Sequence, residues 1–304
     1  MIYSNDDMIK LIYDTKAVSI WNRQTGPVFW YAASVPGPFY VNTELVIGKN
    51  LAEELLTKIT DIIATTTDLA DRAKQLNQLI LAAHANSSVY QNVIDTMVVA
   101  ADKECPRNNY AMVSGGERRD WLFSIPFAKV CDIKHAFLFK NMEIFCEQPL
   151  SAGETTLHVA DLINYAASYF DLWLSTLAKA QIKCNGTVVV NTRGTNGLQR
   201  LEANGQKIVA LNNIDLDFFE QSASNGLIDR ETLEEIAIYF VSAKDWAAKY
   251  LIGRSDLFDV KTTDRKSFER LQSFFTNDPW DLRTEHSVFF AKMQEAIATK
   301  TKAA

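Results

Sequence analysis

Apolar strands alternate with helices through the middle of the chain, and this alternation restricts the possible folds more than any other feature. Short apolar runs are each followed by a loop and a segment with helical spacing. Strands joined in this way predict parallel pairing, and a parallel sheet needs helices on both of its faces. The predicted strands are residues 110–114, 135–140, 155–161, 186–192 and 206–215. The sequence therefore predicts an α/β fold with a mainly parallel sheet covered on both faces.

The regions on either side of this core have other patterns. The N-terminal part predicts helices over 6–18, 51–63 and 73–85. Between the first two helices, two β-type runs (28–32 and 39–46) flank a turn at Pro36, Gly37 and Pro38, and Asn50 is the expected N-cap of the second helix. After Phe219 the helical pattern continues alone, over 229–250, 264–275 and 285–299. We therefore expect three regions: 1–85, 86–220 and 221–304.

Composition and charge exclude several classes of function. The net charge of −6, without a stripe of lysine and arginine, argues against nucleic acid as a partner but leaves room for a small phosphorylated ligand. The scattered cysteines favour reduced core thiols over a disulfide framework or a zinc site. The N-terminus is acidic and polar, and no apolar run approaches the length of a membrane span. We therefore expect a cytoplasmic protein without a membrane partner.

The stretch TTLHVADLINYAAS, residues 155–168, carries the strongest chemical signal. A buried strand ends near Asp161, and a short loop leads to a helix that starts near Ser168. Such a strand end is where α/β proteins bind phosphate and ribose, because the N–H groups at the helix start attract anions. Asp161 is either a ribose ligand or the cap of the following turn, and its place at the strand end favours the ligand. His158, within the strand, is expected to be a buried imidazole with its hydrogen bonds satisfied.

Five segments in the same order along the chain resemble the type I phosphoribosyltransferases, and among them the orotate phosphoribosyltransferases. GPFYVNTELVIGKNLAEELLTKI looks like the N-terminal hood, and VSGGERRDWLFSIPFAK like the first core strand with its pyrophosphate loop. HAFLFK looks like the strand that ends in a lysine, and LSAGETTLHVADLINYAAS occupies the place of the family signature. GTVVVNTRGTNGLQRLEANGQKIVALNNID is similar to the last two core strands. The resemblance covers roughly residues 25–220, and the helical extension lies outside it.

This resemblance implies transfer of ribose 5-phosphate from phosphoribosyl pyrophosphate to a nitrogenous base, by a homodimer. Magnesium is implied with the bound donor alone, so no residue is assigned as a metal ligand, and none is assigned a catalytic role. The resemblance places ribose and phosphate on Asp161, Asn164, Tyr165, Ala166, Ala167 and Ser168. It places pyrophosphate on Gly115, Gly116, Arg118, Arg119 and Lys140, and the base on Tyr40 and Arg193.

The sequence departs from the family pattern where the chemistry is concentrated. Ala160 stands in place of one of two adjacent carboxylates. Residues 164–167 replace hydroxyl and glycine residues that let the backbone approach a phosphate, and alanine is expected to present its N–H there at negative φ. Tyr165 is bulky enough to fill a phosphate pocket. The loop after Lys140 is short and brings no further cation.

Each basic or aromatic candidate also has a purely structural interpretation. Arg118 and Arg119 are equally a solvated pair at a helix start, Lys140 a surface lysine and Tyr40 a core aromatic. Two alternatives to an active transferase therefore remain open. One is a catalytically inactive nucleotide-binding or regulatory protein, and the other is an interaction protein whose helical extension contacts a partner.

Overall fold

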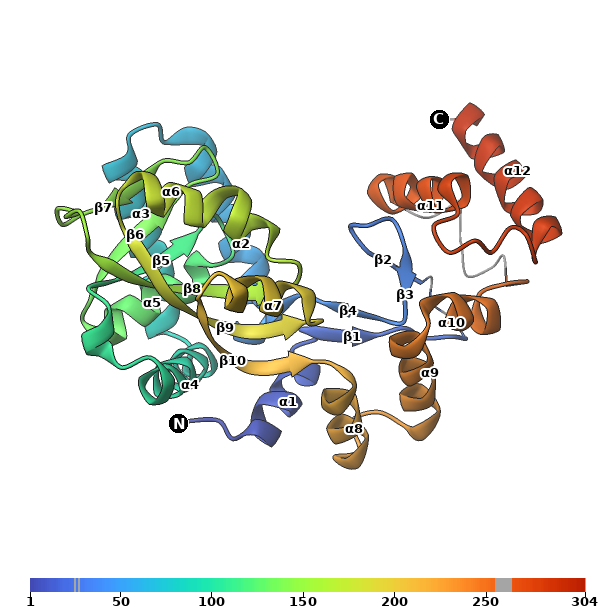
Figure 1. The fold of residues 1–304 in the computed structure, drawn as a ribbon, viewed down its shortest axis with the longest axis horizontal. Coiled ribbons are helices and arrows are strands. Elements are labelled where there is room, and N and C mark those ends of the chain that lie inside the picture. Colours follow the sequence, from blue (N-terminus) through green and yellow to red (C-terminus); the bar gives the residue numbers. More distant parts are fainter. Residues whose placement is uncertain (25, 27, 255–263, 304) are drawn as a thin grey trace. The chain divides into compact units, whose positions relative to one another are not determined.

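The computed structural model describes residues 1–24, 26, 28–254 and 264–303 (Figure 1). The chain forms two compact units. The first contains Met1–Ala17 and Asn42–Phe218, and the second contains Val18–Val41 and Phe219–Ala304. The division of the chain into the regions 1–85, 86–220 and 221–304 stays a prediction from the sequence.

A six-stranded sheet in the order β10-β9-β8-β5-β6-β7 forms the centre of the first unit. Its strands are β5 (Met112–Gly116), β6 (Lys134–Leu138), β7 (Ile144–Cys146), β8 (Thr155–Ile163), β9 (Lys183–Arg193) and β10 (Lys207–Ile214). All neighbours pair in parallel except β6 and β7, which are antiparallel. The predicted mainly parallel α/β sheet is thus confirmed, and the edge strand β7 is an addition that the sequence pattern did not predict.

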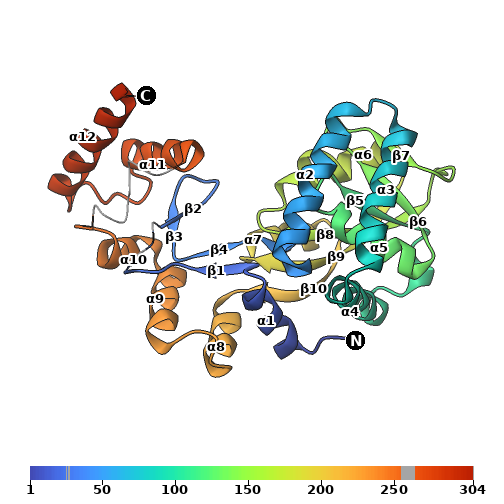
Figure 2. The same ribbon diagram turned by 180° about the vertical axis from the view of Figure 1, so that it is seen from behind.

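Helices cover both faces of this sheet, and the residues between them form its core. The helices before β5 are α1 (Asn5–Asp14), α2 (Lys49–Thr65), α3 (Leu69–Ala85) and α4 (Ser88–Glu104). Those after β5 are α5 (Trp121–Cys131), the π-helical turn η3 (Tyr169–Trp173) with α6 (Leu174–Lys179), and α7 (Asn196–Ala203). Figures 1 and 2 show α6 and α7 on one face and α2, α3 and α5 on the other. Apolar side chains under η3 and α6, including Ala160, Trp173 and Leu177, form one continuous buried cluster.

Local sequence explains where several helices begin and corrects one expectation. Ser4 and Asp7 form a capping box at α1, and Ser87 caps α4. The prediction that Asn50 caps the second helix is wrong, because α2 begins at Lys49 and the cap position is Gly48. Gly48 has φ of +107°, which a residue with a Cβ rarely adopts, so the glycine lets the chain turn from the 3-10 helix η1 (Thr43–Ile47) into α2.

The second unit contains two short antiparallel ladders and a group of helices. Strand β1 (Val18–Ile20) pairs with β4 (Phe39–Val41), and β2 (Phe29–Trp30) pairs with β3 (Pro36–Gly37). The turn predicted at Pro36 and Gly37 is wrong, because both residues belong to β3, and the second predicted β run ends at Val41. The helices are α8 (Leu216–Ser224), which begins at the end of the first unit, α9 (Arg230–Val241), α10 (Ala243–Tyr250), α11 (Arg265–Asn277) and α12 (Ser287–Ala303).

An aromatic core holds the helices of the second unit together. Trp21, Trp30, Trp246 and Phe274 are buried in one apolar cluster. The indole N–H of Trp246 donates to buried Glu235, which therefore has a partner inside the core. Among the described residues, no helix is both long and apolar enough to cross a membrane.

Candidate functional site

The crevice at the carboxyl ends of β5 and β8 is the natural place for a ligand in this sheet. These two strands are parallel neighbours, with Ser114 opposite His158. After β5 the chain turns to α5 on one face, and after β8 it turns to η3 and α6 on the other. The two loops therefore diverge from a shared edge, which is the arrangement that binds ligands in open α/β sheets.

A cavity of about 370 Å³ lies at this edge, between the two diverging loops. The structure brings most of the predicted phosphate, ribose and pyrophosphate residues to its lining. These are Arg118, Arg119, Lys140, Asp161, Asn164, Tyr165, Ala166, Ala167 and Ser168. The roles that the resemblance gives these side chains stay predictions.

The loop of residues 164–168, which we call the signature loop, presents its backbone to the cavity. Ala166 has φ of +55°, so the expectation of negative φ for the alanines is wrong at this position. The left-handed conformation costs a residue with a Cβ about 1 kcal/mol, and such conformations concentrate at functional sites. Among the described residues, none accepts a hydrogen bond from the backbone N–H groups of residues 165–168, which follow the strand ladder.

Contacts from α7 hold the signature loop in place. One guanidinium N–H of Arg200 donates to the carbonyl of Tyr165 at 2.6 Å. A Cβ at Gly197 would lie 2.1 Å from the carbonyl oxygen of Asn164, so only glycine permits this close approach of helix and loop. The side chain of Tyr165 is 57% exposed, so its ring is not buried in the cavity.

Two carboxyl groups meet in this cavity, and the sequence pattern identified one of them. Asp161 does not cap a helix, since the next helical turn begins at Tyr169. Asp120, which follows β5, accepts a hydrogen bond from the backbone N–H of Asp161 at 3.1 Å. Burial, and then the neighbouring Asp120 carboxyl, raise the pKa of Asp161 well above its ordinary value. The available signal for Asp120 was an acid in the loop after a strand that pairs with the strand of Asp161.

A buried histidine lies next to this pair of acids. His158 is 1% exposed, and its Nδ1 is 3.0 Å from the hydroxyl oxygen of Ser114. Its Nε2 lies 3.6 Å from Oδ2 of Asp120, and this buried nitrogen has no hydrogen-bond partner among the described residues. The expected burial of His158 is confirmed, and the expected satisfaction of both ring nitrogens is wrong.

The basic side chains of the site differ in how freely they can meet an anion. Arg119 forms an ion pair with Glu44 at 2.9 Å, and Arg118 donates to the hydroxyl of Thr60. Both arginines lie in the loop before Trp121, the first residue of α5, and these contacts restrain their side chains. The side chain of Lys140 is exposed and has no hydrogen bond or ion pair with a described residue. Lys140 is therefore the least committed cation of the cavity.

The remaining predicted residues lie outside the cavity lining. Gly115 and Gly116 are buried in β5, and added Cβ atoms would lie 2.0 Å from Ser124 and 2.3 Å from Trp173. Close packing thus accounts for both glycines. Arg193 ends β9, and Tyr40 belongs to the second unit, where its ring contacts Phe29.

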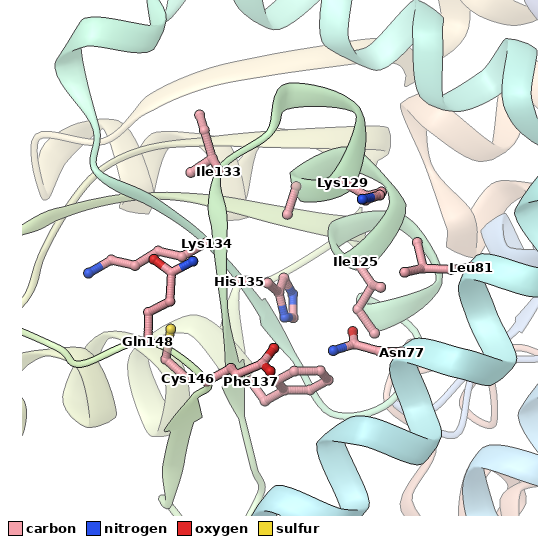
Figure 3. A pocket seen from close by; sticks show the side chains of 12 residues that line it. Asn77, Leu81, Ile125, Lys129, Ile133, Lys134, His135, Phe137, Cys146 and Gln148 are labelled. Carbon is pink, nitrogen blue, oxygen red and sulfur yellow. The ribbon is translucent and has the colours of Figure 1, made fainter.

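A second cavity of about 300 Å³ lies beside β6, next to α3, α5 and β7 (Figure 3). His135 lies near its centre, with Lys134 and Gln148 on one side and Ile125 and Asn77 on the other. Lys134 forms an ion pair with Glu154 at 2.6 Å, and His135 is hydrogen-bonded to Ser124 at 2.9 Å. Burial lowers the pKa of His135 to about 3, so its imidazole is neutral.

Comparison with known proteins identifies the fold and no sequence family. No protein-family model matches the sequence, and no curated protein matches it. The orotate phosphoribosyltransferase from Aeropyrum pernix is similar in structure, with a TM-score of 0.50 and 12% identity, over 73% of this chain and 99% of that one. The fold is therefore that of the type I phosphoribosyltransferases, in agreement with the sequence analysis.

Two further solved structures have slightly lower scores. Orotate phosphoribosyltransferase from Francisella tularensis gives a TM-score of 0.49 at 12% identity, over 76% of this chain and 96% of that one. The UMP synthase of Leishmania donovani gives 0.49 at 10% identity, over 79% of this chain and 42% of that one. The chain thus spans less than half the length of the UMP synthase.

Proposed function

We propose that the cavity between β5 and β8 binds phosphoribosyl pyrophosphate, and that the chain transfers ribose 5-phosphate from it to a nitrogenous base, orotate or a related one. The observation that carries this proposal is the signature loop. The N–H groups of residues 165–168 have no acceptor in the described part of the chain, and Ala166 has a left-handed conformation in the same cavity as Asp161. Successive N–H groups in such a loop form a concave site for an anion.

The charges of the site fit the three parts of this donor. The signature loop would hold the 5′-phosphate through backbone N–H groups, and Asp161 would accept hydrogen bonds from the ribose. Arg118, Arg119 and Lys140, on the opposite side of the crevice, would hold the pyrophosphate, because charge-assisted hydrogen bonds to phosphate are strong. This division keeps the carboxylate away from the anionic ends of the ligand.

The residues also fit magnesium that arrives with the donor. The described residues contain no group of three or more histidine, cysteine or acidic side chains that could hold a metal alone. Mg²⁺ is typically bound by one or two carboxylates together with substrate phosphates, and Asp120 and Asp161 supply such oxygens at the cavity. When bound, magnesium would neutralise charge on the leaving pyrophosphate.

In the transfer itself, the chain would act by placement and electrostatics. The carboxylates would stabilise the positive charge that develops on the ribose, while Lys140 and the two arginines would stabilise the departing pyrophosphate. Tyr40 and Arg193 stay the proposed contacts of the base.

A cytoplasmic homodimer is part of the same proposal, and sedimentation at micromolar concentration would test the dimer.

Binding without transfer is the second candidate, and a specific observation favours it. Arg119 is already paired with buried Glu44, so one cation of the site is partly neutralised before any ligand binds. Together with Ala160 in place of an acid, this reduces the charge available to a transition state. A protein with such a site would bind the donor as a regulatory ligand.

Calorimetric titration with phosphoribosyl pyrophosphate and magnesium separates these possibilities. We expect binding, followed by release of pyrophosphate when the correct base is added from a panel that includes orotate. Binding without release for any base would support the regulatory candidate. Absence of binding at millimolar donor would overturn both.

A matched pair of variants tests the signature loop within this experiment. Ser168 has φ of −59°, a value that proline adopts, and proline removes one N–H donor, whereas alanine removes the hydroxyl and keeps the N–H. We expect Ser168→Pro to weaken donor binding about tenfold, the effect of roughly one charge-assisted hydrogen bond, and Ser168→Ala to weaken it less. Equal affinities for the two variants would remove the backbone from the phosphate site.

A further inference from the structure

We propose that Asp120 supplies the second ribose-binding carboxylate in place of the one missing at Ala160. The two neighbouring hydroxyls of the ribose would then be held by Asp120 and Asp161, one from the loop after β5 and one from the end of β8. This inference rests on the proposed function, since it names the part of the ligand that each acid holds.

Asp120 and Asp161 both line the cavity although 41 positions separate them in the chain. The Oδ1 atom of Asp120 accepts the backbone N–H of Asp161 at 3.1 Å, which brings the two carboxyl groups together. The side chain of Asp120 is 12% exposed, and it lines the cavity. In the family signature the two acids are adjacent in sequence. In this chain the pairing of β5 with β8 brings two distant acids close together in space.

Position 160 itself does not provide the acid in this chain, because it carries an alanine. Ala160 is 1% exposed and belongs to the apolar cluster beneath η3 and α6, together with Trp173 and Leu177. A carboxylate there would be buried without a partner, at a cost of several kcal/mol. The second acid therefore has to come from another segment, and the loop after β5 is the neighbour that reaches the crevice.

The surroundings of Asp120 fix its carboxyl group in one orientation. Besides the N–H of Asp161, the N–H of Gly116 donates to Oδ2 at 3.1 Å. A Cβ at Gly116 would lie 2.7 Å from this oxygen, so the glycine is needed for the acid to sit here. The buried Nε2 of His158, which has no hydrogen-bond partner among the described residues, lies 3.6 Å from the same oxygen. Such fixed groups bind a ligand without losing rotamer freedom.

The chemistry of a close pair of acids selects hydroxyl groups over phosphate. Two carboxyl groups that lie close together repel a phosphate. Their oxygens accept hydrogen bonds, and each ribose hydroxyl can donate one. The pair therefore orients the sugar, with the phosphate directed to the signature loop.

Ribose 5-phosphate and 2-deoxyribose 5-phosphate test this assignment, because they differ by one hydroxyl. We expect the wild-type chain to bind ribose 5-phosphate about tenfold more tightly, since loss of that hydroxyl leaves an acid unpaired. Asp120→Asn should reduce the preference to about twofold while affinity for inorganic phosphate stays within about threefold. Glu117→Gln, which changes another acid of the same cavity, should keep the full preference.

The outcomes distinguish this inference from the proposed function. If neither sugar phosphate nor inorganic phosphate binds the wild-type chain, the proposed function fails and this inference fails with it. If both sugars bind equally well, or if Asp120→Asn keeps the tenfold preference, this inference alone is overturned. Should Asp120→Asn not fold, Asp120→Ser provides the same comparison, with inorganic phosphate binding as the check of an intact signature loop.

Discussion

Two cavities of similar size lie in the first unit, and their difference separates a candidate site from packing. The cavity between β5 and β8 measures about 370 Å³, and the one beside β6 measures about 300 Å³. The first has backbone N–H groups without an acceptor among the described residues, a left-handed alanine, and an Asp120 carboxyl group that accepts the backbone N–H of Asp161. In the second, Lys134 is paired with Glu154, and His135 is neutral and hydrogen-bonded to Ser124.

Volume therefore does not distinguish the two cavities, and the state of the polar groups does. A fold gains nothing from like charges held together or from a strained backbone, so both are signs of a site built for a ligand. In the second cavity the lysine and the Nε2 atom of the histidine have partners, as is usual for packed polar groups, although the buried Nδ1 of His135 has none among the described residues. Each prediction below tests one side of this comparison.

The largest expected effect concerns His135 in the second cavity. Burial, and secondarily His158, lower the pKa of His135 to about 3, whereas an unfolded histidine has a pKa near 6.5. Below pH 6.5 the unfolded chain takes up a proton that the folded chain refuses, so stability falls as pH falls towards 3. Between pH 6.5 and 4 the loss is about 3 kcal/mol.

Urea unfolding at several pH values measures this effect, with His135→Gln as the comparison. Carboxyl groups also titrate in this range, so the quantity of interest is the difference between the wild-type chain and the variant. On acidification, we expect the free energy of unfolding to fall more steeply for the wild-type chain than for the variant. The difference in slope should correspond to the uptake of roughly one additional proton on unfolding. Equal pH dependence would show that His135 is accessible and would weaken the contrast between the cavities.

A pair of charge reversals compares the two cavities directly. Lys140 lines the first cavity and Lys129 lines the second, and both side chains are exposed. We expect Lys140→Glu to weaken binding of phosphoribosyl pyrophosphate about thirtyfold, because it replaces an attraction to the anion by a repulsion, and Lys129→Glu to change it less than threefold. Similar losses for both variants would mean that general charge, not the site, controls affinity.

The sequence predicted the parallel sheet because its strands are buried on both faces and are apolar along their length. Strand β8, for example, is buried from Thr156 to Ala160. The sequence did not predict β7, because this edge strand has only three residues and all of them are half-buried. The cap at Gly48 was missed because glycine acts there through its positive φ, which a pattern of capping side chains does not reveal.

The sequence predicted the site residues that are contiguous in the chain. It did not predict those that only strand pairing brings together. Asp161 and the signature loop form one continuous segment, so the order of motifs was enough to find them. Asp120 becomes a site residue only through the pairing of β5 with β8, which brings distant segments together. The conformation of Ala166 was mispredicted because tertiary contacts, such as that of Arg200 with Tyr165, override the local preference of alanine.

The acid pair in the first cavity should reduce stability at neutral pH. Because the pKa of Asp161 is raised in the folded chain, the folded chain keeps a proton that the unfolded chain releases, and stability falls as pH rises above about 4. Asp161→Asn removes this effect and keeps the oxygen that accepts the N–H of Leu162. We expect a melting temperature a few degrees higher than wild type at pH 7.5, with the difference shrinking as pH falls and vanishing below about pH 3, where Asp161 is protonated in both the folded and the unfolded chain.

Thermal unfolding at these two pH values, beside donor binding at pH 7.5, checks the prediction. The variant should gain stability and lose affinity, which is the trade-off expected of a functional group. A variant that is less stable than the wild-type chain at pH 7.5 would show that Asp161 is a structural residue.

The smallest expected effect compares neighbouring alanines in the signature loop. Glycine at position 166 relieves the left-handed strain of about 1 kcal/mol but makes the unfolded chain more flexible, so the two effects nearly cancel. Ala167 does not have a positive φ, and Ala167→Gly gains no relief and loses roughly 0.5–1 kcal/mol. The two variants should therefore differ by about 1 kcal/mol in the free energy of unfolding. Equal losses would mean that Ala166 is not strained. The conformation of the signature loop would then follow from its own sequence, and strain at Ala166 would no longer support a ligand site.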